Sequence, residues 1–170
     1  LTGADPARAF RLLNDSGLLR QVLPELDRLK TIPYLTTDKT CWDYTLLALA
    51  QGSPFVSSEF ALATLFSKLG NMVGDPWHRQ VETHTLLTEL GRRLKLPKKS
   101  IAQMVQVALE HKKCYFVSQM HMANLKRFLR QPYCQTILEL YKLECVVTGS
   151  DLGVYQYCQG KLSALAPHWQ

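Results

Sequence analysis

The chain has 170 residues, of which 46% are hydrophobic and 20% are charged, and its formal net charge is +6. This composition is typical of a globular protein that is long enough to bury a core. It contains no run of about 18 apolar residues and no signal-peptide pattern, so neither a membrane span nor a membrane partner is expected. Because the sequence opens with Leu1 rather than Met, we expect a fragment of a longer protein.

Hydrophobic residues recur with helical spacing along nearly the whole chain. Asp5 and Asp75 each precede a proline, which is typical of a helix start, and Ser57 or Ser58 can cap another helix. The expected helices cover residues 5–17, 18–30 (with a kink or restart at Pro24), 41–51, 57–69, 75–94, 98–112, 122–131, 132–147 and 151–165. Only residues 114–117 offer a short strand pattern, which we interpret as a connector. The sequence therefore predicts an all-α array of about eight or nine helices with short connections.

The positive charge is concentrated in one part of the sequence. Residues 91–130 hold ten of the 20 Lys and Arg residues and a single acid, Glu110. Such asymmetry indicates a polyanionic partner, whose phosphates the cations would neutralise. A solvated surface that keeps the protein soluble is the alternative, and charge by itself leaves the two open.

Motifs for catalysis or metal binding are poor. The five cysteines are widely spaced, so we expect reduced, buried thiols in a cytoplasmic protein. The five histidines form no His-Asp dipeptide and no His-Glu-x-x-His, and the chain has no glycine-rich phosphate loop. From these patterns we predict no catalytic residue and no metal ligand.

The strongest binding feature is residues 124–132, NLKRFLRQP. Helical spacing places Lys126, Arg127 and Arg130 on one face and the apolar Leu125, Phe128 and Leu129 on the other. Such a helix can be anchored by one side and contact phosphates with the other, without reading bases. A second basic group lies earlier in the same half of the chain, at Arg92, Arg93, Lys98 and Lys99.

Three ordered blocks resemble the C-terminal helical region of bacterial tRNA nucleotidyltransferases (CCA-adding enzymes) and poly(A) polymerases. They are LKRFLRQPY at 125–133, ILELYKLEC at 137–145 and GSDLGVYQYC at 149–158. The segments 9–26 and 92–97 are similar to earlier parts of that region.

The resemblance implies that residues 1–35 are neck- and body-like helices and residues 36–170 an HD-like helical domain with C-terminal helices, or that both form one continuous domain. In the family, nucleotidyl transfer with Mg²⁺ and ATP or CTP belongs to an N-terminal catalytic head, which this chain lacks. The implied partners are tRNA or another structured RNA and a head in the same polypeptide, and no cofactor is expected in the fragment itself.

Many family members also carry a metal-binding HD site in this region, and the resemblance places its degenerate counterpart here. Tyr44 stands where the family has a histidine, and Ser67 and Lys68 replace the His-Asp pair, while His111 and Glu144 match later ligand positions. A lysine brings a positive charge to the place of the ion. We therefore interpret residues 62–74 as the relic of a metal site, without phosphohydrolase activity.

Three functions follow as hypotheses. The first is a non-catalytic RNA-binding module whose phosphate contacts are Arg92, Arg93, Lys98, Lys99, Lys126, Arg127 and Arg130. The alternatives are a metal-dependent HD-type phosphohydrolase with an unusual ligand set, and a protein-interaction module that no longer binds RNA.

Overall fold

The computed structural model describes residues 5–35, 38–73 and 78–165, and this part of the chain is all α-helical. It divides into two compact units, unit 1 at Leu1–Leu109 and unit 2 at Glu110–Gln170. The expected domain boundary near residue 35 is a different division from this one, and it remains a prediction. None of the described helices is long and apolar enough to cross a membrane.

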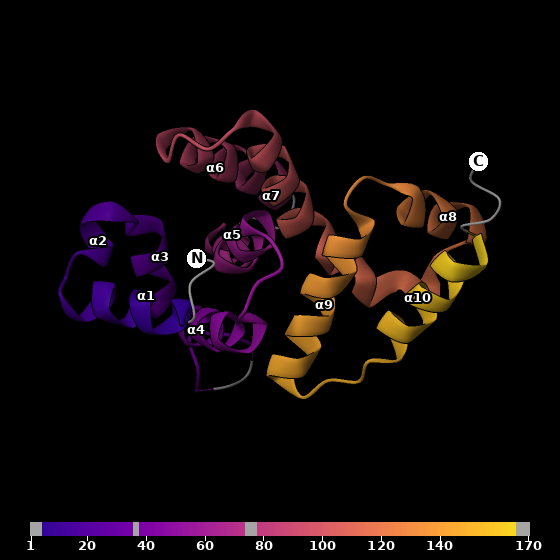
Figure 1. The fold of residues 1–170 in the computed structure, drawn as a ribbon, viewed down its shortest axis with the longest axis horizontal. Helices are drawn as coiled ribbons and strands as arrows, with labels where there is room; N and C mark the ends of the chain where they lie inside the picture. Colours follow the sequence, from indigo (N-terminus) through magenta and orange to yellow (C-terminus); the bar gives the residue numbers. More distant parts are fainter. Residues whose placement is uncertain (1–4, 36–37, 74–77, 166–170) are drawn as a thin grey trace. The chain divides into compact units, whose positions relative to one another are not determined.

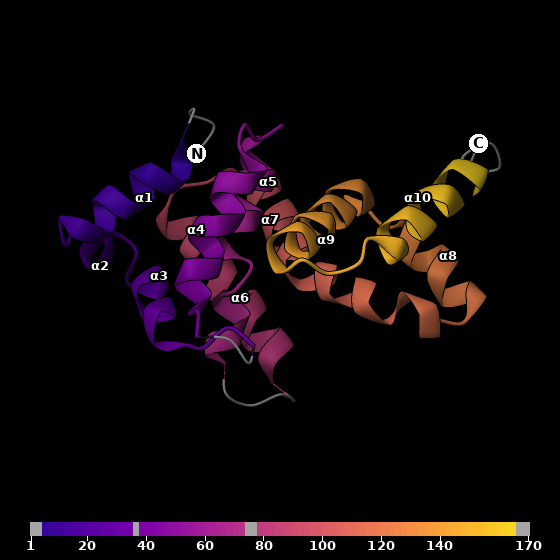
Figure 2. The same cartoon turned by 90° about the horizontal axis from the view of Figure 1, so that it is seen from below.

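The described residues of unit 1 form seven α-helices (Figure 1). They are α1 (Pro6–Asp15), α2 (Leu19–Val22), α3 (Pro24–Arg28), α4 (Cys41–Gly52), α5 (Ser58–Phe66), α6 (Arg79–Arg93) and α7 (Lys98–Glu110), whose last residue opens unit 2. Short 3₁₀ helices cover Leu29–Thr31 (η1) and Leu69–Met72 (η2). Helix α4 packs against α1, α5 and η1, and α6 packs against η2 (Figure 2).

Unit 2 follows with η3 (His111–Gln119), α8 (Met122–Arg130), α9 (Cys134–Thr148) and α10 (Gly153–Leu165). Helix α9 contacts η3, α8 and α10, so it forms the centre of this unit. Its buried side includes Ile137, Leu138, Leu140 and Tyr141. Residues 114–117, which we expected to be a connector, belong to the 3₁₀ helix η3.

The helix boundaries follow from local chemistry. The Asp5 carboxylate accepts a hydrogen bond from the Arg8 backbone N–H at 2.8 Å, which confirms the predicted start of α1. Thr40 and Asp43 form a reciprocal capping box at α4, and the Ser57 hydroxyl caps α5. At the end of α9, Gly149 adopts φ +69, a left-handed conformation that glycine allows without strain.

The restart expected at Pro24 is confirmed, because Pro24 lacks the backbone N–H that would continue α2 and the helix expected at 18–30 is divided into α2 and α3. The described residues therefore contain ten α-helices rather than eight or nine. The expected start of the helix at 132–147 differs from the structure. Helix α9 begins at Cys134 rather than at Pro132, because Tyr133 has φ +62 and lies outside the helical region. The predicted cap at Asp75 lies outside the described residues.

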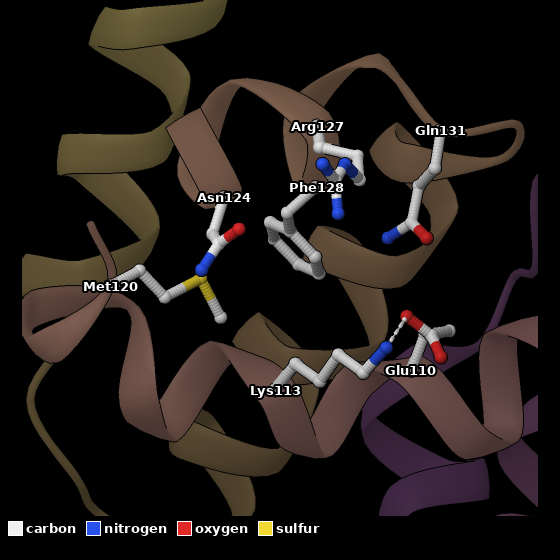
Figure 3. Close-up of a pocket in the computed structure, with 7 residues that line it drawn as sticks. All are labelled: Glu110, Lys113, Met120, Asn124, Arg127, Phe128 and Gln131. Atoms are coloured by element: carbon white, nitrogen blue, oxygen red, sulfur yellow. Dashed lines mark ion pairs between the residues drawn. The ribbon is translucent and has the colours of Figure 1, made fainter. Parts of the chain in front are cut away.

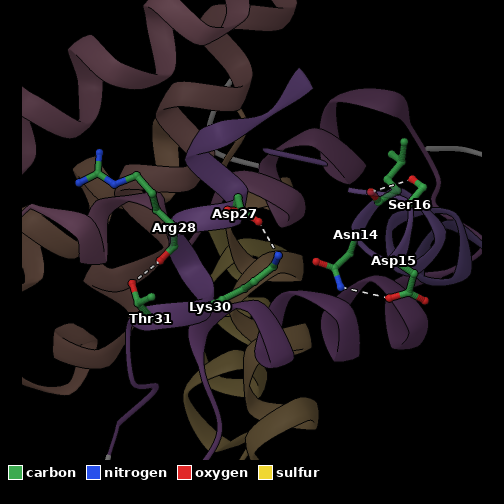
Figure 4. Close-up of polar contacts among 8 residues, drawn as sticks. Asn14, Asp15, Ser16, Asp27, Arg28, Lys30 and Thr31 are labelled. Atoms are coloured by element: carbon green, nitrogen blue, oxygen red, sulfur yellow. Dashed lines mark hydrogen bonds and ion pairs between the residues drawn. The ribbon is translucent and has the colours of Figure 1, made fainter. Parts of the chain in front are cut away.

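Short polar contacts close the ends of the helices near the N-terminus (Figure 4). The Ser16 hydroxyl donates to the Leu13 carbonyl at 3.1 Å, and the Thr31 hydroxyl donates to the Arg28 carbonyl at 2.9 Å. Lys30 forms an ion pair with Asp27. All three contacts span three residues, so they satisfy helix ends locally rather than join distant segments.

Candidate nucleic-acid interface

The basic face of α8 is an exposed strip on a helix whose apolar side is buried. Lys126, Arg127 and Arg130 are exposed, whereas Leu125 and Leu129 are each 2% exposed. The sequence predicted this division, and the apolar side anchors the helix within unit 2. Arg127 and Arg130 lie in the last turn, where the carbonyl end of the helix dipole favours positive charge.

Helix α8 begins at a histidine rather than at one of the commoner capping residues. The His121 Nδ1 atom accepts a hydrogen bond from the Ala123 backbone N–H at 3.4 Å. The helix therefore starts at Met122, and its register is fixed before the basic strip begins. Lys126 and Arg127 form no ion pair within the described part of the chain. Their charges are thus available to an anionic ligand.

The second predicted basic group lies in unit 1, at the turn between α6 and α7. Arg92, Lys98 and Lys99 are exposed. Arg93 is also exposed, but its Nη2 atom lies 2.6 Å from Oε2 of Glu25, so part of its charge is already compensated. Of the four, Arg93 is therefore the weakest candidate for a phosphate contact.

Glu59 places a carboxylate near the same group. Its pKa is lowered from the ordinary value, first by a backbone hydrogen bond and then by the hydroxyls of Ser100 and Ser58. The Ser100 hydroxyl donates to Glu59 Oε1 at 2.8 Å, and Lys99 adds a smaller attraction. The charge of Glu59 offsets part of the positive potential of Lys99.

A pocket lies beside the basic face of α8, within unit 2 (Figure 3). It has a volume of about 330 Å³ and is open to solvent. Its walls are Glu110, Lys113, Met120, Asn124, Arg127, Phe128 and Gln131. Figure 3 shows the side chains of Arg127 and Phe128, on α8, and of Gln131, at its C-cap, extending toward Lys113 and Glu110, which form an ion pair at 2.7 Å. Sequence reasoning did not find this pocket.

Lys68, one of the predicted degenerate HD positions of unit 1, lies in an aromatic cage formed by Tyr44 and Tyr34. Lys68 is 2% exposed, and its Nζ atom lies 4.2 Å from the ring centroid of Tyr44 and 5.1 Å from that of Tyr34. The two rings are stacked, with centroids 4.4 Å apart. The Ser67 hydroxyl donates to the Thr64 carbonyl at 3.0 Å, within its own helix turn. The structure thus brings Tyr44 and Lys68 together and adds Tyr34, which the sequence analysis missed.

This arrangement does not fit a divalent cation. An ammonium group is itself a cation without a lone pair, and it repels an ion where the HD carboxylate would bind one. The donor set of Tyr44, Ser67 and Lys68 contains no carboxylate and no imidazole. No group of three or more His, Cys, Asp or Glu residues in the described part of the chain is arranged to hold a metal ion.

The remaining two HD positions meet in unit 2. His111 Nε2 lies 3.5 Å from Glu144 Oε2, with the two side chains 1% and 5% exposed. One residue opens η3 and the other lies on α9, so the pair joins two elements of the same unit. The pair offers only two side chains of ligand type, fewer than the three or four protein ligands of a zinc site.

The cysteines are free and buried, as the sequence predicted. Burial is the main cause that raises the pKa of Cys134 and of Cys158 to about 11, and these thiols are neutral near pH 7. They are therefore poor nucleophiles and poor metal ligands.

Comparison with known proteins gives sequence relatives but no family model that matches. The Multifunctional CCA protein of Methylobacillus flagellatus is 30% identical over 139 residues, which cover 74% of this chain and 33% of that protein. The Multifunctional CCA protein of Acinetobacter baumannii (strain AYE) is 27% identical over 135 residues, or 72% of this chain and 32% of that protein. The chain therefore spans about a third of the length of the curated relatives it matches.

Fold and comparison together define an all-α protein that is similar to one part of the multifunctional CCA proteins. The similarity supports a relation to one region of the multifunctional CCA proteins. The HD-like core and the individual phosphate contacts remain predictions.

Proposed function

We propose that this chain is a non-catalytic, cytoplasmic RNA-binding module of a tRNA nucleotidyltransferase-like protein, and that its ligand is tRNA or a similarly structured RNA. The observation that carries the proposal is the exposed strip of Lys126, Arg127 and Arg130 on a helix anchored by its apolar side. Three cations at this spacing can contact successive phosphates without contacting bases. The similarity to multifunctional CCA proteins supports RNA as the polyanion.

Binding of this kind depends on shape and salt. A-form stems are recognised mainly through their backbones, so a stem or hairpin should be preferred over any particular sequence. Arg92, Lys98 and Lys99 are proposed as further phosphate contacts, with Arg93 contributing less because of Glu25. Nucleotidyl transfer, with its Mg²⁺ and nucleoside triphosphates, is assigned to a head in the same polypeptide.

The test is fluorescence anisotropy of labelled tRNA at two salt concentrations. The test variant is Lys126→Glu/Arg127→Glu/Arg130→Glu. The matched control is Arg8→Glu/Arg11→Glu/Arg20→Glu, which changes three exposed residues of α1 and α2. Each variant replaces three positive by three negative charges, so both lower the formal charge from +6 to zero (6 − 3 × 2).

We expect the α8 variant to lose most binding and the control to lose little. Three lost phosphate contacts should flatten the slope of log K against log salt by about 2.7 for a duplex stem. If both variants lost the same affinity, RNA binding would depend on net charge and not on the basic face of α8. Weak binding by the unaltered protein at both salt concentrations would refute RNA binding.

The HD-type phosphohydrolase is the less favoured function, because Lys68 and its two tyrosines replace the ion and its ligands. We expect no hydrolysis of bis-p-nitrophenyl phosphate with Mg²⁺, Mn²⁺ or Ni²⁺. Turnover that a chelator abolishes would restore this function and contradict the relic interpretation. For the protein-interaction alternative, the chain should fail to bind RNA at low salt.

A further inference from the structure

We propose that the pocket beside α8 binds one unpaired nucleotide of the RNA, with its phosphate at Arg127 and its base against Phe128 and Met120. This inference rests on the proposed function and adds the kind of RNA that is preferred. The pocket has the three features that a nucleotide requires: a cation, an apolar wall and amide groups.

The apolar wall and the cation meet at the border between the apolar and the basic face of α8. Asn124, Arg127 and Phe128 are spaced i, i+3 and i+4, so their side chains project toward the same side of α8. Figure 3 shows Phe128 at the centre of the group, between Asn124 and Arg127. Lys126 and Arg130 belong to the strip but do not line the pocket. The RNA backbone can therefore follow the strip while one nucleotide turns into the pocket.

An unsatisfied amide provides the independent observation. The Gln131 Nε2 atom is buried and has no hydrogen-bond partner within the described residues. An unmet buried donor is costly, and a ligand acceptor that reaches it recovers that cost. Every nucleobase carries a ring nitrogen or carbonyl oxygen that accepts such a bond. The donor thus favours a base over a purely anionic group.

The size of the pocket limits the ligand to one nucleotide. About 330 Å³ is near the lower end of the range for small-molecule sites. Lys113 is engaged by Glu110 at 2.7 Å, which leaves Arg127 as the main phosphate ligand. An acidic peptide side chain could use Arg127, but it would leave the apolar wall and the Gln131 donor unused.

The experiment compares two RNA hairpins that share a stem, one fully paired and one with a single bulged nucleotide. The variants are Gln131→Leu, which removes the donor, and Gln119→Leu, a matched change of an exposed residue outside the pocket. We expect the unaltered protein and the Gln119→Leu variant to bind the bulged hairpin roughly tenfold more tightly. The Gln131→Leu variant should lose most of this preference for the bulged hairpin and retain only the part that the apolar wall supplies.

A second readout observes the pocket directly. In ¹⁵N–¹H spectra, AMP should shift the side-chain amide signals of Gln131 and Asn124, while ribose 5-phosphate should shift them much less. Equal affinity of the unaltered protein for both hairpins would overturn the inference and leave the proposed function intact. Failure to bind either hairpin would overturn the proposed function as well. Larger shifts with a glutamate-rich peptide than with AMP would identify the pocket as a peptide site.

Discussion

The strength of the contact between Lys68 and the aromatic cage around it in unit 1 can be measured. The perturbation is a double-mutant cycle between Lys68 and Tyr44, with the variants Lys68→Met, Tyr44→Leu and both together. Methionine retains most of the apolar stem and removes the ammonium group. Leucine removes the ring and retains an apolar side chain. The cycle isolates the contact itself, because the costs of burying the charge and of altering the core cancel.

The expected coupling follows from the distances. A desolvated cation over a tyrosine ring contributes about 2 kcal/mol, and the Lys68 ammonium lies 4.2 Å from the Tyr44 centroid in a site where the side chain is 2% exposed. We therefore expect Tyr44→Leu to cost about 2 kcal/mol more in the presence of Lys68 than beside Met. The same cycle with Tyr34→Leu should give about 1 kcal/mol, because its centroid lies farther away, at 5.1 Å.

The free energies of unfolding come from urea titrations that follow tryptophan fluorescence, to which Trp42, buried in α4, contributes. Tyr44→Phe is the control, since it retains the ring and should retain the coupling to Lys68. Coupling energies below about 0.5 kcal/mol in both cycles would show that the cage does not stabilise the ammonium. The account of Lys68 as a structural replacement for an ion would then be wrong.

Three further predictions concern stability. Because the pKa values of Cys134 and Cys158 are raised from 9.0 to about 11, the stability that these two neutral thiols contribute is complete below pH 9 and is lost between pH 9 and 11. Their share of the loss at pH 10 should be about 3 kcal/mol, measured by urea titration as the difference in pH dependence between the unaltered protein and the double alanine variant. Gly91→Ala should destabilise unit 1 by about 1–3 kcal/mol, because an added Cβ would lie 2.7 Å from Cγ1 of Ile101; an unchanged melting temperature would show that α6 and α7 adjust freely. Thr40→Ala should cost about 1 kcal/mol by removing the hydroxyl cap of α4, and Thr40→Ser should recover most of it.

Much of the fold was predictable because helices depend on short-range patterns. Caps, prolines and apolar spacing act within four residues, so most helices appeared near their expected positions. Tyr133 shows the limit of this approach. A left-handed tyrosine before α9 has no local signal, and tertiary packing overrides the preference of the preceding proline for a helix start.

The candidate site was predictable only in part. The spacing of Lys126, Arg127 and Arg130 determined which side of α8 is exposed, because one helix face must be buried and the other solvated. The pairing of Arg93 with Glu25 could not be predicted, since 68 residues separate them and no periodicity connects them.

By itself, the sequence determined an all-α chain and the basic strip of α8, and it led to the prediction of a degenerate HD site. Only the tertiary structure decided that Tyr34 stacks on Tyr44 to surround Lys68, and that Gln131 presents a buried amide to a pocket whose opposite wall is η3. The physical reason is that backbone preferences act over one helical turn. A cage or a pocket instead arises when side chains distant in sequence exclude water from a shared volume.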